Sequence, residues 1–370
     1  VPSSGSGCTI AGKGREKANA MVCETVVIGL NWVGDNVLAL PTYKALQHRF
    51  RAEGGIAVAA PANVATLLET TGVFKQVVAW NRNTRQRIAA LRAGGFKRAV
   101  ILPNSFRAAA VAFAAGIEER WGYPSDWRGL LLTHPVPKPQ QRGHQLDDYL
   151  PLLNALGATR LVDDIPTIKL PQSVHERGRR RLINIGLHLD RPVIGIHPGG
   201  LYGRAKHWGD AAYVDVIKRL RTDGFDVVLL TSPRERDQAE RIATTCNGVP
   251  MVGHDGDVLE LAAAISQCAA VITNDSGPLH VATALAVPSV SIFGPTDPER
   301  TVIPGATRVV RRTLACQPCY QRECPLGHHR CMADVSVDEV FHAAVGMFTE
   351  VEPAADVSES QNRKVIELPL

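Results

Sequence analysis

Short apolar runs alternate with amphipathic segments along almost the whole chain, and this alternation constrains the fold more than any other feature. Residues 25–30 and 56–60 have the length and composition of buried strands. The strand at 25–30 is followed by a segment with helical spacing of apolar residues, at 37–49. Alternating strands and helices favour a parallel sheet with helices on both faces. The expected fold class is therefore α/β.

The pattern is interrupted near residues 163–172, where Asp, Pro and Lys replace the apolar runs. A chain of 370 residues is long for one domain and ample for two. We expect two doubly wound, Rossmann-like domains that face each other across a cleft, at residues 22–172 and 173–350. Residues 1–21 are expected to be a disordered extension, and residues 351–370 a tail.

Composition limits the class of protein. Apolar residues make up 45% of the chain and charged residues 21%, as in soluble globular proteins. No apolar run approaches the roughly 20 residues that span a bilayer. The formal net charge of +5 suits loose attachment to an anionic membrane surface, although an ordinary basic protein would have the same charge.

A polar turn at residues 274–280, with the sequence Asn-Asp-Ser-Gly-Pro-Leu-His, separates a predicted buried strand from a predicted helix. Free N–H groups at the helix start, with Gly277 allowing close approach, would bind an anion. Asp275 and His280 add polar groups at the carboxyl end of a strand, where open α/β sheets bind ligands. An ordinary turn with a capping side chain is nearly as good an explanation of this segment alone.

Three further predicted strands also end in polar or glycine-rich loops. The strand at 192–196 is followed by His-Pro-Gly-Gly and then by a basic stretch that contains Lys206. The strands at 225–230 and 289–293 lead to Glu235 and Thr296. Glycines and cations at strand ends suit a diphosphate. Together with the turn at 274–280, these strand ends indicate one crevice that holds a nucleotide. None of these loops is a complete P-loop or dinucleotide fingerprint.

At these residues the chain resembles the heptosyltransferases of glycosyltransferase family 9, and within them the heptosyltransferase II branch. The resemblance runs in order from about residue 26 to about residue 348. It is carried by Asn-Trp-Val-Gly-Asp at 31–35, His-Pro-Gly-Gly at 197–200, Lys-His-Trp at 206–208, Asp-Ser-Gly-Pro-Leu-His at 275–280 and Phe-Gly-Pro-Thr-Asp-Pro at 293–298.

The resemblance implies a GT-B fold and an inverting transfer of heptose from a nucleoside diphosphate heptose, expected to be ADP-heptose, to the inner core of lipopolysaccharide. It implies no cofactor requirement and no metal in catalysis. The first domain would bind the acceptor and the second the nucleotide sugar. The implied donor-binding residues are Lys206, Glu235, Asp275, Ser276, Gly277, Pro278, His280 and Thr296.

Asp35 is the expected catalytic base. It follows the first strand at a predicted helix start, and glycosyl transfer to an alcohol needs a group that accepts the hydroxyl proton. The matching aspartate has this role in the resembled family. Helix capping is the alternative role, and the two are compatible. A helix N-terminus favours the carboxylate, which should weaken Asp35 as a base.

Acceptor recognition is less specific in the sequence. The resemblance implies an anionic lipid-linked saccharide, so Asn104, Arg120 and Arg128 are candidate acceptor-binding residues in the first domain. For each arginine taken alone, a solvated surface role is the better explanation. The expected location is the cytoplasm, with peripheral contact at the cytoplasmic face of the inner membrane, and no nucleic acid partner is expected.

Four cysteines lie within sixteen positions, Cys316, Cys319, Cys324 and Cys331, with two histidines among them. A C-x2-C pair with two further thiols has the chemistry of a metal site, although the spacing is not that of a standard zinc ribbon. A structural metal, an iron–sulfur cluster, reduced thiols and disulfides remain open, with disulfides least favoured in a reducing compartment.

Two other classes of function are compatible with these features. The first is another enzyme on the same scaffold, such as a different glycosyltransferase or a nucleotide-sugar epimerase. The second is a non-catalytic nucleotide-sugar-binding protein, which would not need Asp35. A dehydrogenase is less favoured, because the turn at residues 30–37 has one glycine instead of a dinucleotide fingerprint.

Overall fold

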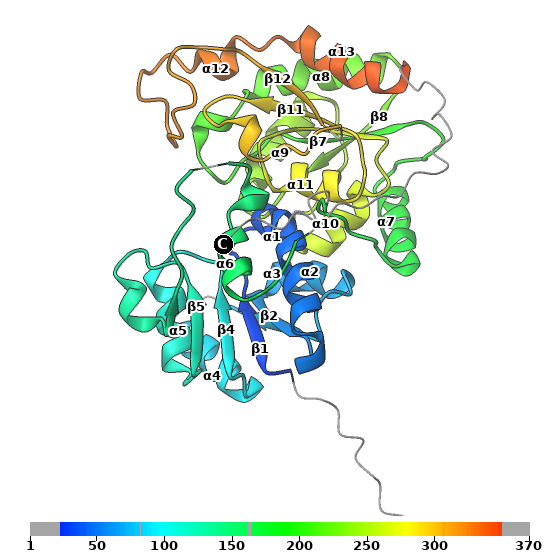
Figure 1. Ribbon diagram of the computed structural model, residues 1–370. Helices are drawn as coiled ribbons and strands as arrows, with labels where there is room; N and C mark the ends of the chain where they lie inside the picture. Colours follow the sequence, from blue (N-terminus) through cyan, green and yellow to red (C-terminus); the bar gives the residue numbers. More distant parts are fainter. Residues whose placement is uncertain (1–22, 82, 142, 161–163, 306, 350–370) are drawn as a thin grey trace, which may run out of the picture.

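The computed structural model describes residues 23–81, 83–141, 143–160, 164–305 and 307–349. Two parallel six-stranded sheets, each flanked by helices, form the two halves of the molecule (Figure 1). The predicted α/β class with two doubly wound domains is confirmed. The extension predicted at residues 1–21 and the tail at 351–370 lie outside the described residues.

The first sheet has the strand order β3-β2-β1-β4-β5-β6. Its elements are β1 (Thr25–Ile28), α1 (Val33–Leu38), α2 (Leu40–Arg49), η1 (Arg51–Glu53), β2 (Ile56–Pro61), α3 (Ala62–Thr70), β3 (Gln76–Trp80), α4 (Thr84–Gly94), β4 (Arg98–Ile101), α5 (Phe106–Ala114), β5 (Glu119–Gly122), η2 (Arg128–Leu131), β6 (His134–Pro135), η3 (Gln145–Asp147) and α6 (Leu150–Ala155).

The second sheet has the order β12-β11-β10-β7-β8-β9, which repeats the topology of the first. Its elements are α7 (Gln172–Asn184), β7 (Val193–His197), η4 (Arg204–Lys206), α8 (Asp210–Thr222), β8 (Asp226–Leu230), α9 (Arg236–Thr245), β9 (Met251–Val252), α10 (Val258–Ile265), β10 (Ala270–Asn274), α11 (Gly277–Ala284), β11 (Ser289–Phe293), η5 (Pro298–Arg300), β12 (Thr307–Arg311), α12 (Arg330–Ala333) and α13 (Val337–Thr349).

The first predicted helix differs from the expectation. Residues 37–49 were expected to form one helix, but the structure has α1 from Val33 and a separate α2 from Leu40. Ala39 caps both helices, and Pro41 lies in the first turn of α2, where its missing N–H costs nothing. The break lets α1 begin early enough to place Asp35 in its first turn.

Strands β5, β6, β9 and β12 were not predicted from the apolar pattern. β5 reads Glu-Arg-Trp-Gly and β12 reads Thr-Arg-Val-Val-Arg. Both lie near or at an edge of their sheet, where charged side chains keep contact with solvent. β6 and β9 have two residues each, too few for any periodicity.

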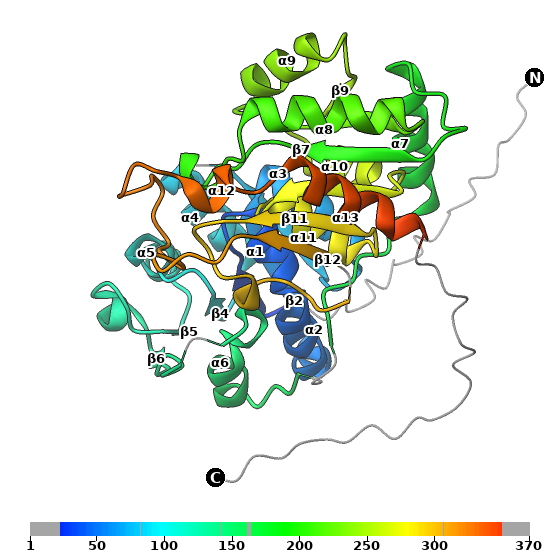
Figure 2. The same ribbon diagram turned by 90° about the horizontal axis from the view of Figure 1, so that it is seen from above.

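In each sheet the chain changes direction between two central strands, β1 and β4 in the first sheet and β7 and β10 in the second. Ligands of open α/β sheets bind at the carboxyl ends of the strands at such a switch point. The loops after β1 and β10 lead directly into α1 and α11, and these two helices pack against each other (Figures 1 and 2). The two switch points are therefore brought face to face.

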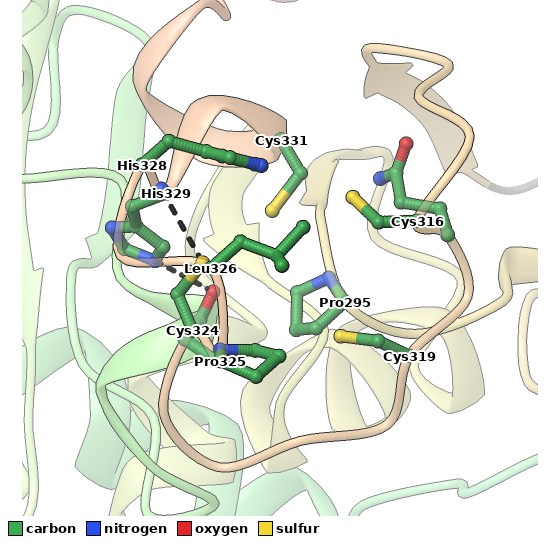
Figure 3. Close-up of a pocket in the computed structure, with 11 residues that line it drawn as sticks. Pro295, Cys316, Cys319, Cys324, Pro325, Leu326, His328, His329 and Cys331 are labelled. Carbon is green, nitrogen blue, oxygen red and sulfur yellow. Dashed lines mark hydrogen bonds between the residues drawn. The ribbon is translucent and has the colours of Figure 1, made fainter.

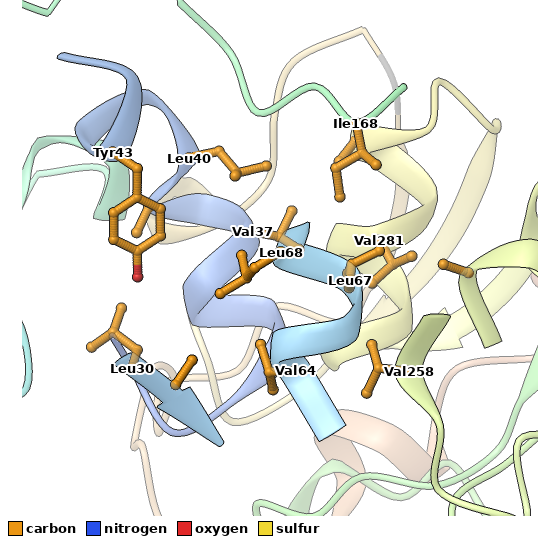
Figure 4. Packing of buried hydrophobic residues seen from close by; sticks show 14 of the residues in the cluster. Leu30, Val37, Leu40, Tyr43, Val64, Leu67, Leu68, Ile168, Val258 and Val281 are labelled. Carbon is orange, nitrogen blue, oxygen red and sulfur yellow. The ribbon is translucent and has the colours of Figure 1, made fainter. Parts of the chain in front are cut away.

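One apolar cluster joins the two halves. Leu30, Val37 and Leu68 of the first half are buried in the same cluster as Val258 and Val281 of the second (Figure 4). Helix α3 packs on α10 within this cluster. Burial of apolar surface across the domain boundary stabilises the relative position of the two switch points.

Within the described ranges, no helix combines the length and the apolar composition that crossing a bilayer requires.

Two glycines allow the close approach of α1 and α11. A Cβ atom at Gly34 would lie 2.6 Å from Cδ2 of His280, and a Cβ atom at Gly277 would lie 2.6 Å from Cγ1 of Val33. Both distances are shorter than carbon atoms tolerate without displacement. Any side chain at these positions would therefore push the helices apart.

Replacement of Gly34 by alanine should destabilise the protein. Alanine is normally favoured over glycine inside a helix by up to about 1 kcal/mol, but overpacking a buried contact costs roughly 1–3 kcal/mol. We expect Gly34→Ala to lower the midpoint of thermal or urea denaturation. Gly129→Ala is the matched control, because its nearest neighbour would be at 3.4 Å. A Gly34→Ala protein at least as stable as the parent would contradict this account of the helix contact.

Candidate active site

Asp35 lies in the first turn of α1, on the side of the first sheet that faces the second domain. The N-cap residue is Trp32, and no side chain caps this helix. The capping role that was the alternative for Asp35 is therefore not found. Its Oδ1 atom accepts a hydrogen bond from Nε2 of Gln145 at 3.0 Å.

A buried asparagine shapes the turn that carries Asp35. The amide of Asn36 donates to the carbonyl oxygens of Leu30 and Trp32, at 2.8 Å each, and its Oδ1 accepts from the hydroxyl of Tyr43 at 2.8 Å. Asn36 and Tyr43 are fully buried. Because each of these buried polar groups has a partner, the turn has one well-defined conformation.

Burial is the main influence on the ionisation of Asp35, and it raises the pKa of this carboxyl above its usual value. The hydrogen bond from Gln145 acts in the opposite direction, as does the positive charge of Lys206, whereas Asp275 raises the pKa further. The pKa of Asp35 is therefore higher than that of an exposed aspartate, whereas the expected weakening of Asp35 as a base by the helix N-terminus stays a prediction.

Asp275 organises the opposite switch point. It accepts from Nζ of Lys206 at 2.5 Å and from the hydroxyl of Thr296 at 2.8 Å, and His280 lies 3.9 Å away. Burial alone would raise the pKa of Asp275, but Lys206, His280 and Thr296 hold it below the usual value. Asp275 thus remains a carboxylate that holds Lys206 in place, its ammonium 4.6 Å from the centre of the Tyr202 ring.

His280 is buried between the two domains. Burial lowers its pKa to about 4, and the effect exceeds the opposing influence of Asp275. The imidazole is therefore neutral near pH 7. Because His280 carries no charge there, Lys206 and not His280 supplies positive charge beside Asp275.

The loop after β10 is tied to the loop after β7. The side chain of Asn274 donates to the carbonyl oxygens of Pro198 and Gly199 at 3.2 and 2.9 Å, and accepts from Tyr213 at 2.8 Å. Ser276 is the N-cap of α11, and Gly277 and Pro278 form its first turn. Like Asn36 and Tyr43 in the first domain, Asn274 and Tyr213 are a buried pair at a switch point.

Glu235 and His197 form a second polar group in the second domain. Nε2 of His197 lies 3.4 Å from Oε2 of Glu235, and its Nδ1 lies 3.2 Å from the hydroxyl of Ser276. His197 is thus hydrogen-bonded on both nitrogens, as expected of a structural histidine. Oε2 of Glu235 also accepts from Ser232, but its Oε1 is buried and carries no hydrogen bond.

The three candidate acceptor residues lie in different environments. Asn104 is exposed at the carboxyl end of β4. The guanidinium of Arg120 donates to the carbonyl oxygen of Leu131 at 2.6 Å, and that of Arg128 is fully buried and donates to the carbonyl oxygen of Tyr123 at 2.6 Å. The contacts of both arginines favour a structural role in the first domain, and Asn104 is the one of the three that is open to a ligand.

The segment at residues 143–148 joins the domains beside Asp35. Arg300 of η5 forms a bidentate ion pair with Asp148, at 3.0 and 2.9 Å, and donates to the carbonyl oxygen of Gly143. Nε2 of His144 lies 3.2 Å from the carbonyl oxygen of Val302. Residues 143–148 are thus held against the second domain while Gln145 contacts Asp35. No motif marks Gln145, because its role depends on contacts between distant parts of the chain.

The four clustered cysteines line one small cavity, together with His328 and His329 (Figure 3). All four are free thiols. Burial raises the pKa of Cys331, whereas backbone N–H groups, chiefly that of His329, lower the pKa of Cys324. Across the described ranges, no three His, Cys, Asp or Glu side chains converge as ligands of a metal ion, so the structural metal considered for these cysteines is not supported.

Comparison with known proteins agrees with this arrangement. The sequence model of glycosyltransferase family 9 (heptosyltransferase) matches residues 84–330. Lipopolysaccharide heptosyltransferase 2 of Salmonella typhimurium is 29% identical over 343 residues, which cover 88% of this chain and 98% of that protein. The protein of the same name from Escherichia coli is 29% identical over 345 residues, with 88% and 99% covered.

The solved structure of E. coli ADP-heptose lipopolysaccharide heptosyltransferase II has the same fold. It matches with a TM-score of 0.76 at 26% identity and covers 88% of this chain and 99% of that chain. The resemblance identified on the sequence motifs and the GT-B fold are thereby confirmed. The alternatives of an epimerase, a dehydrogenase and a non-catalytic binding protein are not retained. The chain belongs to glycosyltransferase family 9, the heptosyltransferases.

Proposed function

We propose that this protein transfers a heptose from ADP-heptose to the inner core of lipopolysaccharide, with inversion at the anomeric carbon. The observation that carries the proposal is the meeting of two switch points, one with a carboxylate of raised pKa and one with a buried Lys206–Asp275 pair. The lipopolysaccharide heptosyltransferases named above support the class of substrate, and the E. coli structure is described as an ADP-heptose enzyme.

Asp35 acts as the base in this reaction. Gln145 holds Oδ1, so Oδ2 is the atom proposed to accept the proton of the acceptor hydroxyl. The hydroxyl oxygen then bonds to the anomeric carbon of the heptose as the bond from that carbon to the diphosphate breaks. ADP leaves with both bonding electrons, and the product is a glycoside. A base with a raised pKa takes the proton more readily than an ordinary aspartate.

The donor half stabilises the leaving diphosphate. Lys206 supplies positive charge, and the N-terminus of α11 at Ser276, Gly277 and Pro278 supplies N–H groups and a favourable dipole. His280 and Thr296 hold Asp275, and Asp275 holds Lys206. Glu235, in the loop after β8, is the residue proposed to accept hydrogen bonds from the ribose hydroxyls. Lys206 and the α11 N-terminus would neutralise the charge of the leaving diphosphate without a metal ion. Transfer without a metal cofactor stays a prediction.

The first domain is proposed to bind the lipid-linked acceptor, with Asn104 open at the carboxyl end of β4. An acceptor with a lipid anchor requires the enzyme to work at a membrane surface, which supports a peripheral location at the cytoplasmic face of the inner membrane. The proposal assigns the sugar donor to one domain and the acceptor to the other, as the two facing switch points suggest.

Asp35→Asn is the test of the proposed function. The change keeps the size of the side chain and removes the base, so turnover should fall roughly 10²–10⁴-fold. Affinity for ADP should change little, because the diphosphate site lies in the other domain. Release of ADP at saturating ADP-heptose measures the turnover, and calorimetry measures the affinity. Near-normal turnover of Asp35→Asn would falsify the catalytic role.

The stability of the same variant separates catalysis from folding. Since burial raises the pKa of Asp35, the folded protein binds this proton more tightly than the unfolded chain does. Ionisation of Asp35 therefore lowers stability as pH rises through its unfolded pKa, and the loss is complete above its folded pKa. Asp35→Asn removes this loss, so its thermal midpoint at neutral pH should equal or exceed that of the parent.

Lys206→Ala should weaken the binding of ADP itself. A charge-assisted contact with phosphate contributes roughly 1.5–3 kcal/mol, which corresponds to a tenfold to hundredfold loss of affinity in calorimetry. The variant also leaves Asp275 buried without its cation, so Lys206→Ala combined with Asp275→Asn is the control for folding. Unchanged affinity for ADP in a folded double variant would show that Lys206 does not bind the diphosphate.

Gln145→Ala should change the pH dependence of turnover. Gln145 lowers the pKa of Asp35 by hydrogen bonding to the carboxylate, so its removal should raise this pKa further. The acid limb of the turnover profile is then expected to move to higher pH, with little change in the Kd of ADP. Gln141→Ala, at an exposed position nearby, is the matched control. Identical acid limbs for Gln145→Ala and the parent would refute this role of Gln145.

A further inference from the structure

The loop between β5 and β6 exposes two large apolar side chains. Trp127 is 91% exposed and Leu130 is 92% exposed, more than any other large apolar residue in the described part of the chain. Single exposed apolar residues are common on protein surfaces, but two almost fully exposed ones within four positions of one loop need an explanation.

The loop is anchored in a defined shape. The buried guanidinium of Arg128 donates to the carbonyl oxygens of Tyr123 and Pro103, and the hydroxyl of Ser125 donates to the carbonyl oxygen of Asn104 at 3.0 Å. These bonds tie the loop to the carboxyl end of β4. The backbone at Trp127, the residue before Arg128, is therefore held in one position.

The backbone beside Arg128 is strained. Asp126 and Trp127 have φ values of 52° and 61°, in the left-handed region that favours glycine. Two consecutive residues without glycine in this region are retained only where the surrounding structure holds them, and such strain is concentrated at functional sites. Trp127 thus combines a strained backbone with a ring that is 91% exposed, which supports a role for this ring.

Helix α5 continues the apolar surface. It packs against η2, which contains Leu130, and its side chains Phe106 and Phe113 are 49% and 54% exposed. The guanidinium of Arg120 lies over the Phe113 ring, 5.2 Å from its centre. We refer to Phe106, Phe113, Trp127 and Leu130 as the aromatic face. It lies over α5 and η2 of the first domain, where α5 packs on α4 and β5 (Figure 1).

The chain segment around the aromatic face is strongly basic. Residues 85–138 contain nine Lys or Arg and three Asp or Glu, a net charge of +6, while the whole chain has +5. The remaining chain is therefore close to neutral. Exposed positions within this segment include Arg85, Arg107 and Lys138. Aromatic and leucine side chains flanked by basic residues are typical of proteins that bind anionic bilayers at the interface.

The aromatic face also lies next to the proposed acceptor side of the cleft. Phe106 follows β4 and Trp127 follows β5, so both lie at the carboxyl edge of the first sheet, the same edge at which Asp35 follows β1. A lipid-linked saccharide anchored in a membrane under this face could reach Asp35 from that edge. Binding of a second copy of the chain, or of an acidic protein, would not require the aromatic face to lie at this edge of the sheet.

We propose that the aromatic face docks on an anionic lipid bilayer, with Trp127 and Leu130 inserted at the boundary of headgroups and acyl chains. The neighbouring arginine and lysine side chains contact the lipid phosphates. The inference deepens the proposed function, since it names the surface through which the acceptor's membrane is met. Insertion of apolar side chains and attraction of basic residues to phosphate act together. Binding to the bilayer should therefore need the side chains of the aromatic face and should weaken as the salt concentration rises.

The test measures binding to vesicles without turnover. The full chain is sedimented with vesicles of phosphatidylethanolamine and phosphatidylglycerol, and separately with vesicles of phosphatidylcholine alone. We expect binding to the anionic vesicles that weakens with salt, and a loss of roughly tenfold or more in the variant that combines Trp127→Ser with Leu130→Ser. Leu326→Ser, at an exposed apolar position of the second domain, is the matched control and should bind like the parent.

Activity distinguishes this inference from the proposed function. The Trp127→Ser/Leu130→Ser variant should keep parental turnover with a detergent-solubilised acceptor and lose turnover with the acceptor in vesicles. If the double variant sediments with anionic vesicles as well as the parent does, or if the parent does not bind them, the docking surface is refuted. A parent that forms dimers in gel filtration, where the double variant is monomeric, would instead assign the face to self-association and also overturn the proposal.

Discussion

The contact between α1 and α11 is the constraint on which the rest of the active site depends. Gly34 lies against His280, and Gly277 lies against Val33, at distances that leave no room for a side chain. Each helix begins at the switch point of its own sheet. Close packing of the two helix starts therefore places the ligand-binding edges of both domains opposite each other, and the apolar cluster around Leu68 and Val258 stabilises that position.

The same closeness sets the charges of the site. Burial acts on Asp35, Asp275 and His280 together, but their partners differ. Asp275 has Lys206 at 2.5 Å and keeps its charge, whereas the carboxylate of Asp35 accepts a hydrogen bond from the amide of Gln145 and has no ion pair with any described residue, and its pKa rises. Two aspartates in one cleft thus have different properties: Asp275 positions a cation, and Asp35 is the one we propose to accept a proton.

Both domains use one device to shape their central turn, a buried asparagine bonded to a buried tyrosine. Asn36 with Tyr43 holds the turn after β1, and Asn274 with Tyr213 holds the turn after β10 against the loop after β7. Arg300 adds a link from the donor domain to the segment that carries Gln145. In this way the second domain holds the segment whose Gln145 donates a hydrogen bond to the proposed base.

The sequence by itself determined the fold class, the positions of the central strands and the polar loops at their ends. Strands and turns depend mainly on neighbouring residues, so apolar runs and glycine-containing turns in the sequence predict them. It did not reveal the break between α1 and α2, the short or charged strands near the sheet edges, or the role of Gln145. Only the tertiary structure decided that Arg128 is a buried anchor beside an exposed Trp127, and that burial raises the pKa of Asp35. Burial, ion pairing and exposure depend on which distant segments meet, and no local pattern contains that information.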